Sequence, residues 1–110
     1  MPFQEYEDHD MLGLAELTRR RALSANEVLT VAIDRIEARN PRLNAVVLRL
    51  DDQAGAQVAV GLPEGPLSGA PYLLKDLYQP FAGAPVSNGS RLFDGFVAPG
   101  RPWFGQRPPA

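Results

Sequence analysis

The stretch at residues 24–41, "SANEVLTVAIDRIEARNP", carries the clearest structural signal in this 110-residue sequence. Ser24 followed three residues later by Glu27 is a capping box, in which each side chain satisfies a free backbone N–H of the first helical turn. Because proline disfavours the helical conformation of the residue before it, the helix is expected to end at Asn40-Pro41. The apolar residues at helical spacing that predict its buried face are Leu29, Ala32, Ile33 and Ile36.

The segments on either side of this helix predict an α/β architecture. Residues 10–23 are expected to form a shorter helix, with Asp10 at its beginning and arginines at its end, where the charges complement the helix dipole. The runs at 43–50 and 72–77 are nearly continuously apolar and predict two buried strands. Residues 51–61 between them allow a short alanine-rich helix, which Gly55 weakens. Two strands alone do not complete a sheet that buries both faces.

Composition excludes several classes of protein. The net charge of −2 and the lack of a basic stripe give no electrostatic support for nucleic acid or anionic membrane as a partner. The chain has no cysteine, which excludes disulfides and thiolate sites, and no apolar run near the ~20 residues that span a bilayer. The acidic residues near the N-terminus are expected to be solvated, so no metal or cofactor is predicted. A cytoplasmic protein is expected.

Lys75 is the only lysine in a chain whose other basic residues are ten arginines, and it lies in the apolar run "GAPYLLKDL", residues 69–77. Burying an ammonium group costs several kcal/mol unless the group is paired or loses its proton. A buried lysine can therefore become a proton acceptor, whereas an arginine stays charged. The structural alternatives are an ion pair between Lys75 and Asp76, or a strand edge with the ammonium group in water. Asp76 itself is expected to orient nearby backbone.

The run "GPLSGAPYLLKDL" at 65–77, followed by "AGAPVSNGSRLFDGF" at 82–96, resembles the amidase signature family, whose members read G-P-L-x-G-x-P-x-x-x-K-D and then a segment ending in G-S. The resemblance extends over residues 6–99. It implies that residues 1–98 are the N-terminal part of an amidase signature domain, with the N-terminal helices and first strands of an incomplete mixed-sheet α/β fold. Residues 99–110 depart from the family pattern as a Pro/Gly-rich tail that is expected to be disordered.

The activity that this resemblance implies is hydrolysis of carboxylic amides by a Ser-cis-Ser-Lys triad, in which Lys75 matches the base. The serine-rich motif that supplies both serines lies downstream of residue 110 in the family. Ser87, Asn88, Gly89 and Ser90 match a segment that shapes the active site, and are candidates for substrate binding. Their structural alternative is a turn in which Gly89 supplies a positive φ.

With the base but not the nucleophile, the 110-residue chain is expected to be inactive alone. Its expected partners are a small amide, as substrate of the full-length enzyme, and the missing remainder of the amidase. A frameshift, a gene fragment and a genuine short form all remain open as origins of the chain. The alternative function is a non-catalytic α/β fragment that folds or acts only with a partner chain, or a gene remnant.

Overall fold

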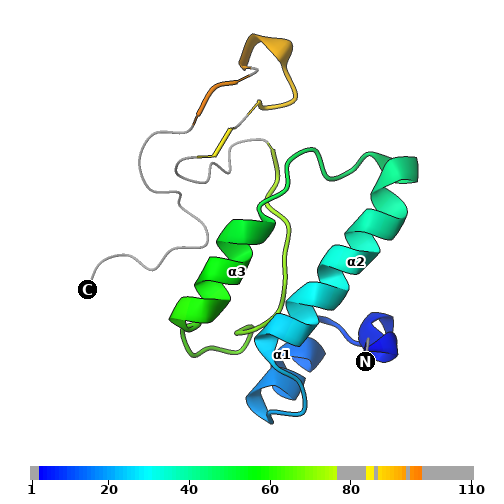
Figure 1. Ribbon diagram of the computed structural model, residues 1–110, viewed down its shortest axis with the longest axis vertical. Coiled ribbons are helices and arrows are strands. Elements are labelled where there is room, and N and C mark those ends of the chain that lie inside the picture. Colours follow the sequence, from blue (N-terminus) through cyan, green and yellow to red (C-terminus); the bar gives the residue numbers. More distant parts are fainter. Residues whose placement is uncertain (1–2, 77–83, 86, 94, 98–110) are drawn as a thin grey trace. The chain divides into compact units, whose positions relative to one another are not determined.

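A computed structural model of the chain describes residues 3–76, 84–85, 87–93 and 95–97 (Figure 1). The chain divides into two compact units, Met1–Tyr72 and Leu73–Ala110. The helices of the first unit are η1 (Gln4–Asp8, a 3-10 helix), α1 (Met11–Arg19), α2 (Ala25–Leu43) and α3 (Asp51–Val60). In the described part of the second unit, the regular elements are the 3-10 helix η2 (Arg91–Phe93) and an isolated antiparallel bridge between Pro85 and Val97.

Local side-chain contacts fix the start of α1, as the sequence predicts. The Asp10 carboxylate accepts the backbone N–H of Gly13 at 2.7 Å, which satisfies one of the free donors of the first turn. At the other end, Arg19 and Arg20 both pair with Glu16. Leu14 and Ala15 are the buried residues of this helix.

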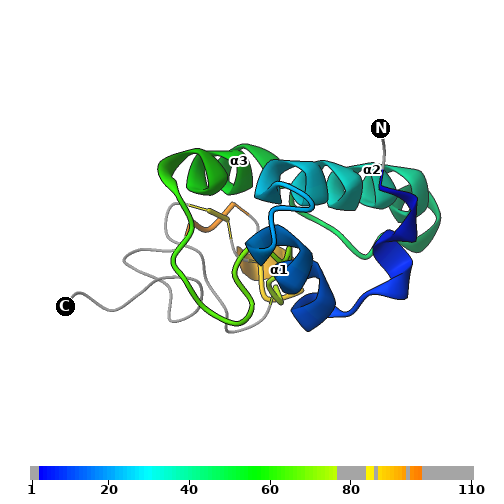
Figure 2. The ribbon, with the colours of Figure 1, turned by 90° about the horizontal axis from the view of Figure 1, so that it is seen from below.

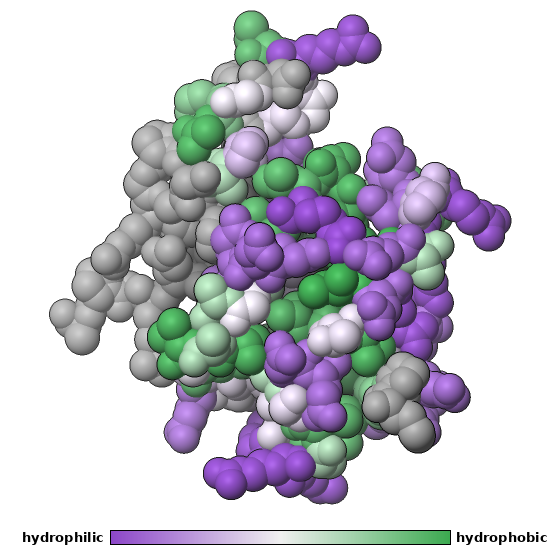
Figure 3. All heavy atoms as spheres, in the orientation of Figure 1, coloured by the Kyte–Doolittle hydropathy of each residue, from purple (hydrophilic) through white to green (hydrophobic). Residues whose placement is uncertain are grey.

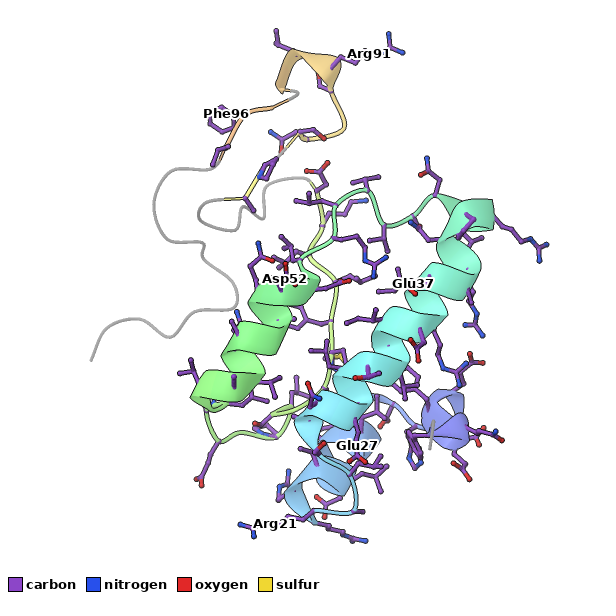
Figure 4. The ribbon with its side chains drawn as sticks, viewed as in Figure 1. Arg21, Glu27, Glu37, Asp52, Arg91 and Phe96 are labelled. Carbon is purple, nitrogen blue, oxygen red and sulfur yellow. The ribbon has the colours of Figure 1, made fainter. Side chains whose placement is uncertain are left out.

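The capping box predicted at the start of α2 is confirmed. Ser24 Oγ accepts the N–H of Glu27 at 3.1 Å, and the Glu27 carboxylate accepts the N–H of Ser24 at 2.7 Å, at the end of α2 that Figure 4 marks with Glu27. The bond from the Ser24 N–H contributes most to lowering the pKa of Glu27, and the Ser24 hydroxyl acts in the same direction, because donors to the carboxylate favour its ionised form.

The buried side of α2 differs from the predicted face. Val28 and Val31 are buried, with 0% and 7% of their surface exposed. The four residues that the spacing places in the core are only partly buried: Leu29, Ala32, Ile33 and Ile36. Because α2 has apolar residues on two adjacent sides, periodicity alone does not decide which side is covered.

The predicted end of α2 at Asn40-Pro41 is also wrong. Pro41 lies inside the last turn, and the helix continues to Leu43. The helix ends at Asn44, whose φ of 49° leaves the right-handed helical region while its N–H still bonds to the Asn40 carbonyl. The Asn40 side chain then holds the departing chain, because its amide bonds to both the N–H and the C=O of Val46, each at 2.8 Å.

The short helix allowed by the sequence over 51–61 is present as α3. Asp51 and Asp52 lie in its first turn, where they complement the helix dipole. Among the described residues the two segments predicted as strands, 43–50 and 72–77, form no ladder with each other. The α/β sheet expected from the sequence therefore stays a prediction.

Figure 2 shows α2 and α3 side by side, with α1 and the segment 61–72 on one side of this pair. Gly69 explains how this segment comes close to α1. Its φ is +91°, and a Cβ atom built there would lie 2.7 Å from the Thr18 methyl carbon. Glycine is therefore required at this position both by backbone conformation and by space.

Much apolar surface of the first unit is uncovered. Figure 3 shows hydrophobic surface between the polar side chains on the face that carries α2 and α3. Val60, Leu43 and Val47 are 89%, 67% and 66% exposed. In the part of the chain that the structure describes, no helix has the length and apolar character that a bilayer crossing needs. The predicted boundary between residues 98 and 99, and the tail at 99–110, lie outside the described residues.

Candidate functional site

Lys75, the predicted base, lies in the second unit in a segment without regular secondary structure. Its side chain is exposed, as are those of Tyr72 and Leu73, at 54% and 66%. This exposure differs from the buried-strand interpretation and agrees with the alternative of an exposed Lys75, and its role as a base stays a prediction. No strand pairs with the segment within the described ranges, and Leu74 and Asp76 are its partly buried residues.

Residues 87–90 form a tight turn, in agreement with the structural alternative considered for them. The N–H of Ser90 bonds to the carbonyl of Ser87 at 2.9 Å. Asn88 and Gly89 both have positive φ, 50° and 70°, which is the pattern of a type I′ turn and of the Asn-Gly pair that favours it. Ser90 also accepts the N–H of Leu92 through its hydroxyl oxygen, at 3.2 Å, within the start of η2. A substrate contact by these four residues stays a prediction.

The turn is bound to the residue that follows Lys75. The Asp76 carboxylate accepts the backbone N–H of Ser87 at 3.0 Å and also the hydroxyl of the same residue. The predicted role of Asp76, orienting nearby backbone, is thus observed. This contact brings the Lys75-Asp76 segment and the turn at 87–89 together across eleven positions of sequence.

The electrostatics of Asp76 follow from these bonds. The hydroxyl of Ser87 contributes most to holding the pKa of the Asp76 carboxyl below its usual value. The backbone N–H groups of Ser87, Asn88 and Gly89 act in the same direction, while partial burial opposes them. Asp76 is accordingly an ionised hydrogen-bond acceptor at neutral pH.

The sequence predicts an orienting role for Asp76 but does not identify Ser87 as its partner. The sequence contains both partners, but nothing in their spacing shows that an acid meets a serine eleven residues later. The Asn-Gly pair predicts that the chain turns at 88–89, and gives no information about what the turn binds.

The first unit contains a hollow of about 240 Å³ beside α2. Phe3, Arg35 and Arg39 contribute to its lining. Both arginines pair with the same Glu7 carboxylate, and Arg35 also lies 5.4 Å from the centre of the Tyr6 ring. These cations already have partners, so the hollow is a weaker candidate for an anionic ligand. Across the described ranges no group of three or more metal-ligating side chains is found.

Comparison with known proteins gives relatives of two kinds. The 6-aminohexanoate-cyclic-dimer hydrolase of Pseudomonas sp. (strain NK87) is 41% identical over 68 residues, which is 62% of this chain and 13% of that enzyme. A glutamyl-tRNA(Gln) amidotransferase subunit from Acidothermus cellulolyticus is 34% identical over 93 residues, covering 78% of this chain and 18% of its own length. The corresponding protein from Alkalilimnicola ehrlichii is 37% identical over 93 residues, covering 78% of this chain and 19% of its own length.

No protein-family model matches this chain, and no solved structure matches it. The curated relatives nevertheless include an amide hydrolase and amidotransferase subunits, the kinds of protein that the resemblance to the amidase signature family implies. The alignments cover part of this chain at modest identity, and the chain spans less than a fifth of the length of these three relatives.

Proposed function

We propose that this chain is the N-terminal part of an amidase signature enzyme that hydrolyses carboxylic amide C–N bonds, and that Lys75 is its proton acceptor. The observation that carries the proposal is the single lysine of the chain, which stands in register in "GPLSGAPYLLKDL", in a chain similar to a cyclic-dimer hydrolase and to amidotransferase subunits. The proposal includes a cytoplasmic location.

The role of Lys75 in this mechanism is to take a proton and pass it on. A neutral amine accepts the proton of a serine hydroxyl, directly or through a second serine, as that hydroxyl attacks the amide carbonyl. The same proton is then available to the leaving amine. Backbone N–H groups stabilise the oxyanion that forms, and water releases the acid from the acyl-enzyme. In the resemblance, both serines and the oxyanion donors come from the motif downstream of this chain.

The 110-residue chain by itself is proposed to be inactive. These 110 residues contain the proposed base but not the serine-rich motif that the resemblance implies, and the Lys75 side chain is exposed. An amine has to be taken out of water to act as a base near neutral pH. That enclosure would have to come from further polypeptide packed around this segment.

A second candidate function is a non-catalytic fragment that folds or acts only with a partner chain, or a gene remnant. The exposed apolar side chains of the first unit favour this reading, because a partner is the usual way to remove such surface from water. The partner that fits both candidates is the remainder of the amidase. The amidotransferase relatives are themselves named as subunits, which is consistent with a chain that acts in an assembly.

The test is amide hydrolysis by the purified chain, alone and co-expressed with the polypeptide encoded directly downstream, with simple aliphatic, aromatic and cyclic amides as substrates. We expect no hydrolysis by the chain alone and hydrolysis by the combination. Lys75→Ala should lower kcat by about 10²- to 10⁴-fold, the usual contribution of a general base.

Lys75→Arg distinguishes a lysine that acts as a proton acceptor from one that only supplies a positive charge. Arginine keeps a positive charge but does not give up its proton, so it should be as inactive as alanine if Lys75 is a base. Arg91→Ala, at an exposed position of η2, is the matched control and should leave activity unchanged (Figure 4). Retained activity in Lys75→Arg would contradict the base, and hydrolysis by the chain alone would contradict the proposed inactivity.

A further inference from the structure

The bond between Asp76 and Ser87 uses both carboxylate oxygens. The N–H of Ser87 bonds to Oδ1 at 3.0 Å, and its hydroxyl bonds to Oδ2. A carboxylate that accepts two donors from one residue fixes both the distance and the direction of that residue. Charge-assisted bonds of this kind are shorter and about twice as strong as neutral ones.

The turn that follows Ser87 places successive residues at positive φ. Asn88 has a φ of 50° and Gly89 continues it at 70°. Successive N–H groups in a turn of this kind form a concave group of donors that suits an anion. The N–H of Ser87 bonds to the Asp76 carboxylate, and the N–H groups of Asn88 and Gly89 act with it in lowering the pKa of that carboxyl, so the chain supplies that anion itself.

Asp76 is also joined directly to the proposed base, because it follows Lys75 in the sequence. We propose that Asp76 is a positioning residue of the active site, whose carboxylate fixes the turn at 87–89 to the main chain that carries Lys75. The distance between this turn and Lys75 then stays constant while the substrate binds and leaves. This role rests on the proposed function, whereas the contact itself does not.

The proposal also narrows what the turn offers to a substrate. The N–H and the hydroxyl of Ser87 are both bonded to Asp76, so neither is available to a substrate while this contact is formed.

The contact is tested by NMR on the full 110-residue chain, without any need for activity. The amide protons of Ser87, Asn88 and Gly89 should shift together with the titration of the Asp76 carboxyl. In Asp76→Asn this pH response should disappear, and the three amides should exchange with solvent about tenfold faster, because a charged acceptor is lost. Asp52→Asn, in the first turn of α3, changes the same charge elsewhere and should leave the three amides unaltered (Figure 4). A wild-type chain with no shared pH response would overturn the contact.

The positioning role is tested in the enzyme reconstituted with its downstream polypeptide. Asp76→Asn should lower kcat about tenfold or more while KM changes little, since the base is displaced and substrate binding is mostly retained. Asp76→Glu should recover part of the loss because it restores a carboxylate. Unchanged kcat in an Asp76→Asn variant whose turn is released would overturn positioning while the contact stands. Absence of activity in the wild-type combination would overturn the proposed function and this role together, with the contact judged by NMR alone.

Discussion

The contacts that start the helices of the first unit differ in range from the contact that joins Asp76 to Ser87 in the second unit. In the first unit, Asp10 binds Gly13 and Ser24 binds Glu27, each pair three residues apart. In the second, the contact that shapes the candidate site joins Asp76 to Ser87 across eleven residues. Short-range contacts form with little loss of chain entropy, whereas a longer loop has to be closed first. The helix starts of the first unit are therefore specified by local sequence, whereas the contact beside Lys75 forms only when its loop closes.

The largest expected effect is the loss of a buried side chain in α1, which tests whether local signals alone stabilise the first unit. Leu14 is buried, at 4% exposed, so Leu14→Ala should lower the free energy of unfolding by about 2–5 kcal/mol. Leu12 lies on the same helix and is 58% exposed, so Leu12→Ala should change it by less than about 0.5 kcal/mol. Urea unfolding followed by far-UV circular dichroism measures both. Equal effects would mean that α1 is held by local signals alone.

The next effect tests a distant contact of the first unit, between Gly69 and Thr18. Gly69→Ala should destabilise the unit by roughly 1–3 kcal/mol, because the new methyl group meets Thr18 and φ is positive. Gly55→Ala is the matched control, since nothing lies within 4 Å of the added atom and the residue is inside α3. It should stabilise the chain by up to about 1 kcal/mol. A harmless Gly69→Ala would show that the segment 61–72 does not pack on α1.

A smaller effect is expected at the capping box. Ser24→Ala removes the acceptor for the Glu27 N–H and should cost about 1 kcal/mol of stability. Ser24→Asp keeps an acceptor at the same place and should cost much less. The urea midpoint of the helical signal distinguishes them. If both substitutions are equally harmful, the loss comes from the position and not from the hydrogen bond.

The smallest effect is expected from lowering the pH. It should destabilise the start of α2 in the first unit and the turn at 87–89 in the second. The pKa of Asp76 and that of Glu27 are lower in the folded chain than in the unfolded chain. Their stabilisation is therefore fully present above the unfolded pKa, about 4, and is lost as the pH falls through the folded values. Hydrogen-exchange protection factors at the start of α2 and at 87–89 should fall below about pH 4. In Asp76→Asn the fall at 87–89 should be absent while that at α2 remains.

The sequence predicts the elements whose signals are local. Asp10 and Ser24 mark helix starts that the structure confirms, and the Asn88-Gly89 pair marks a turn that it contains. The same reasoning misplaced the end of α2, because a proline near the last turn is tolerated and Asn44 is what ends the helix. It also assigned the wrong buried side to α2, since residues on two adjacent sides are apolar.

Burial and long-range contacts are harder to predict from a single sequence. The apolar run around Lys75 predicts a buried strand, yet a strand is buried only by neighbours, and the described residues provide none for it. No periodic pattern in the sequence predicts the contact of Asp76 with Ser87. The α/β class and the substrate role of residues 87–90 stay predictions for the same reason.

The turn at 87–89 has a consequence for how the chain responds to dissolved anions. Its acceptor is attached to the same chain, eleven residues away, and a tethered group of this kind acts at an effective concentration in the millimolar range or above. Formate or phosphate at micromolar concentration should therefore fail to displace it. In Asp76→Ala, the same donors should bind formate from solution. The turn would then be an anion-binding site that the Asp76 carboxylate occupies in the wild-type chain.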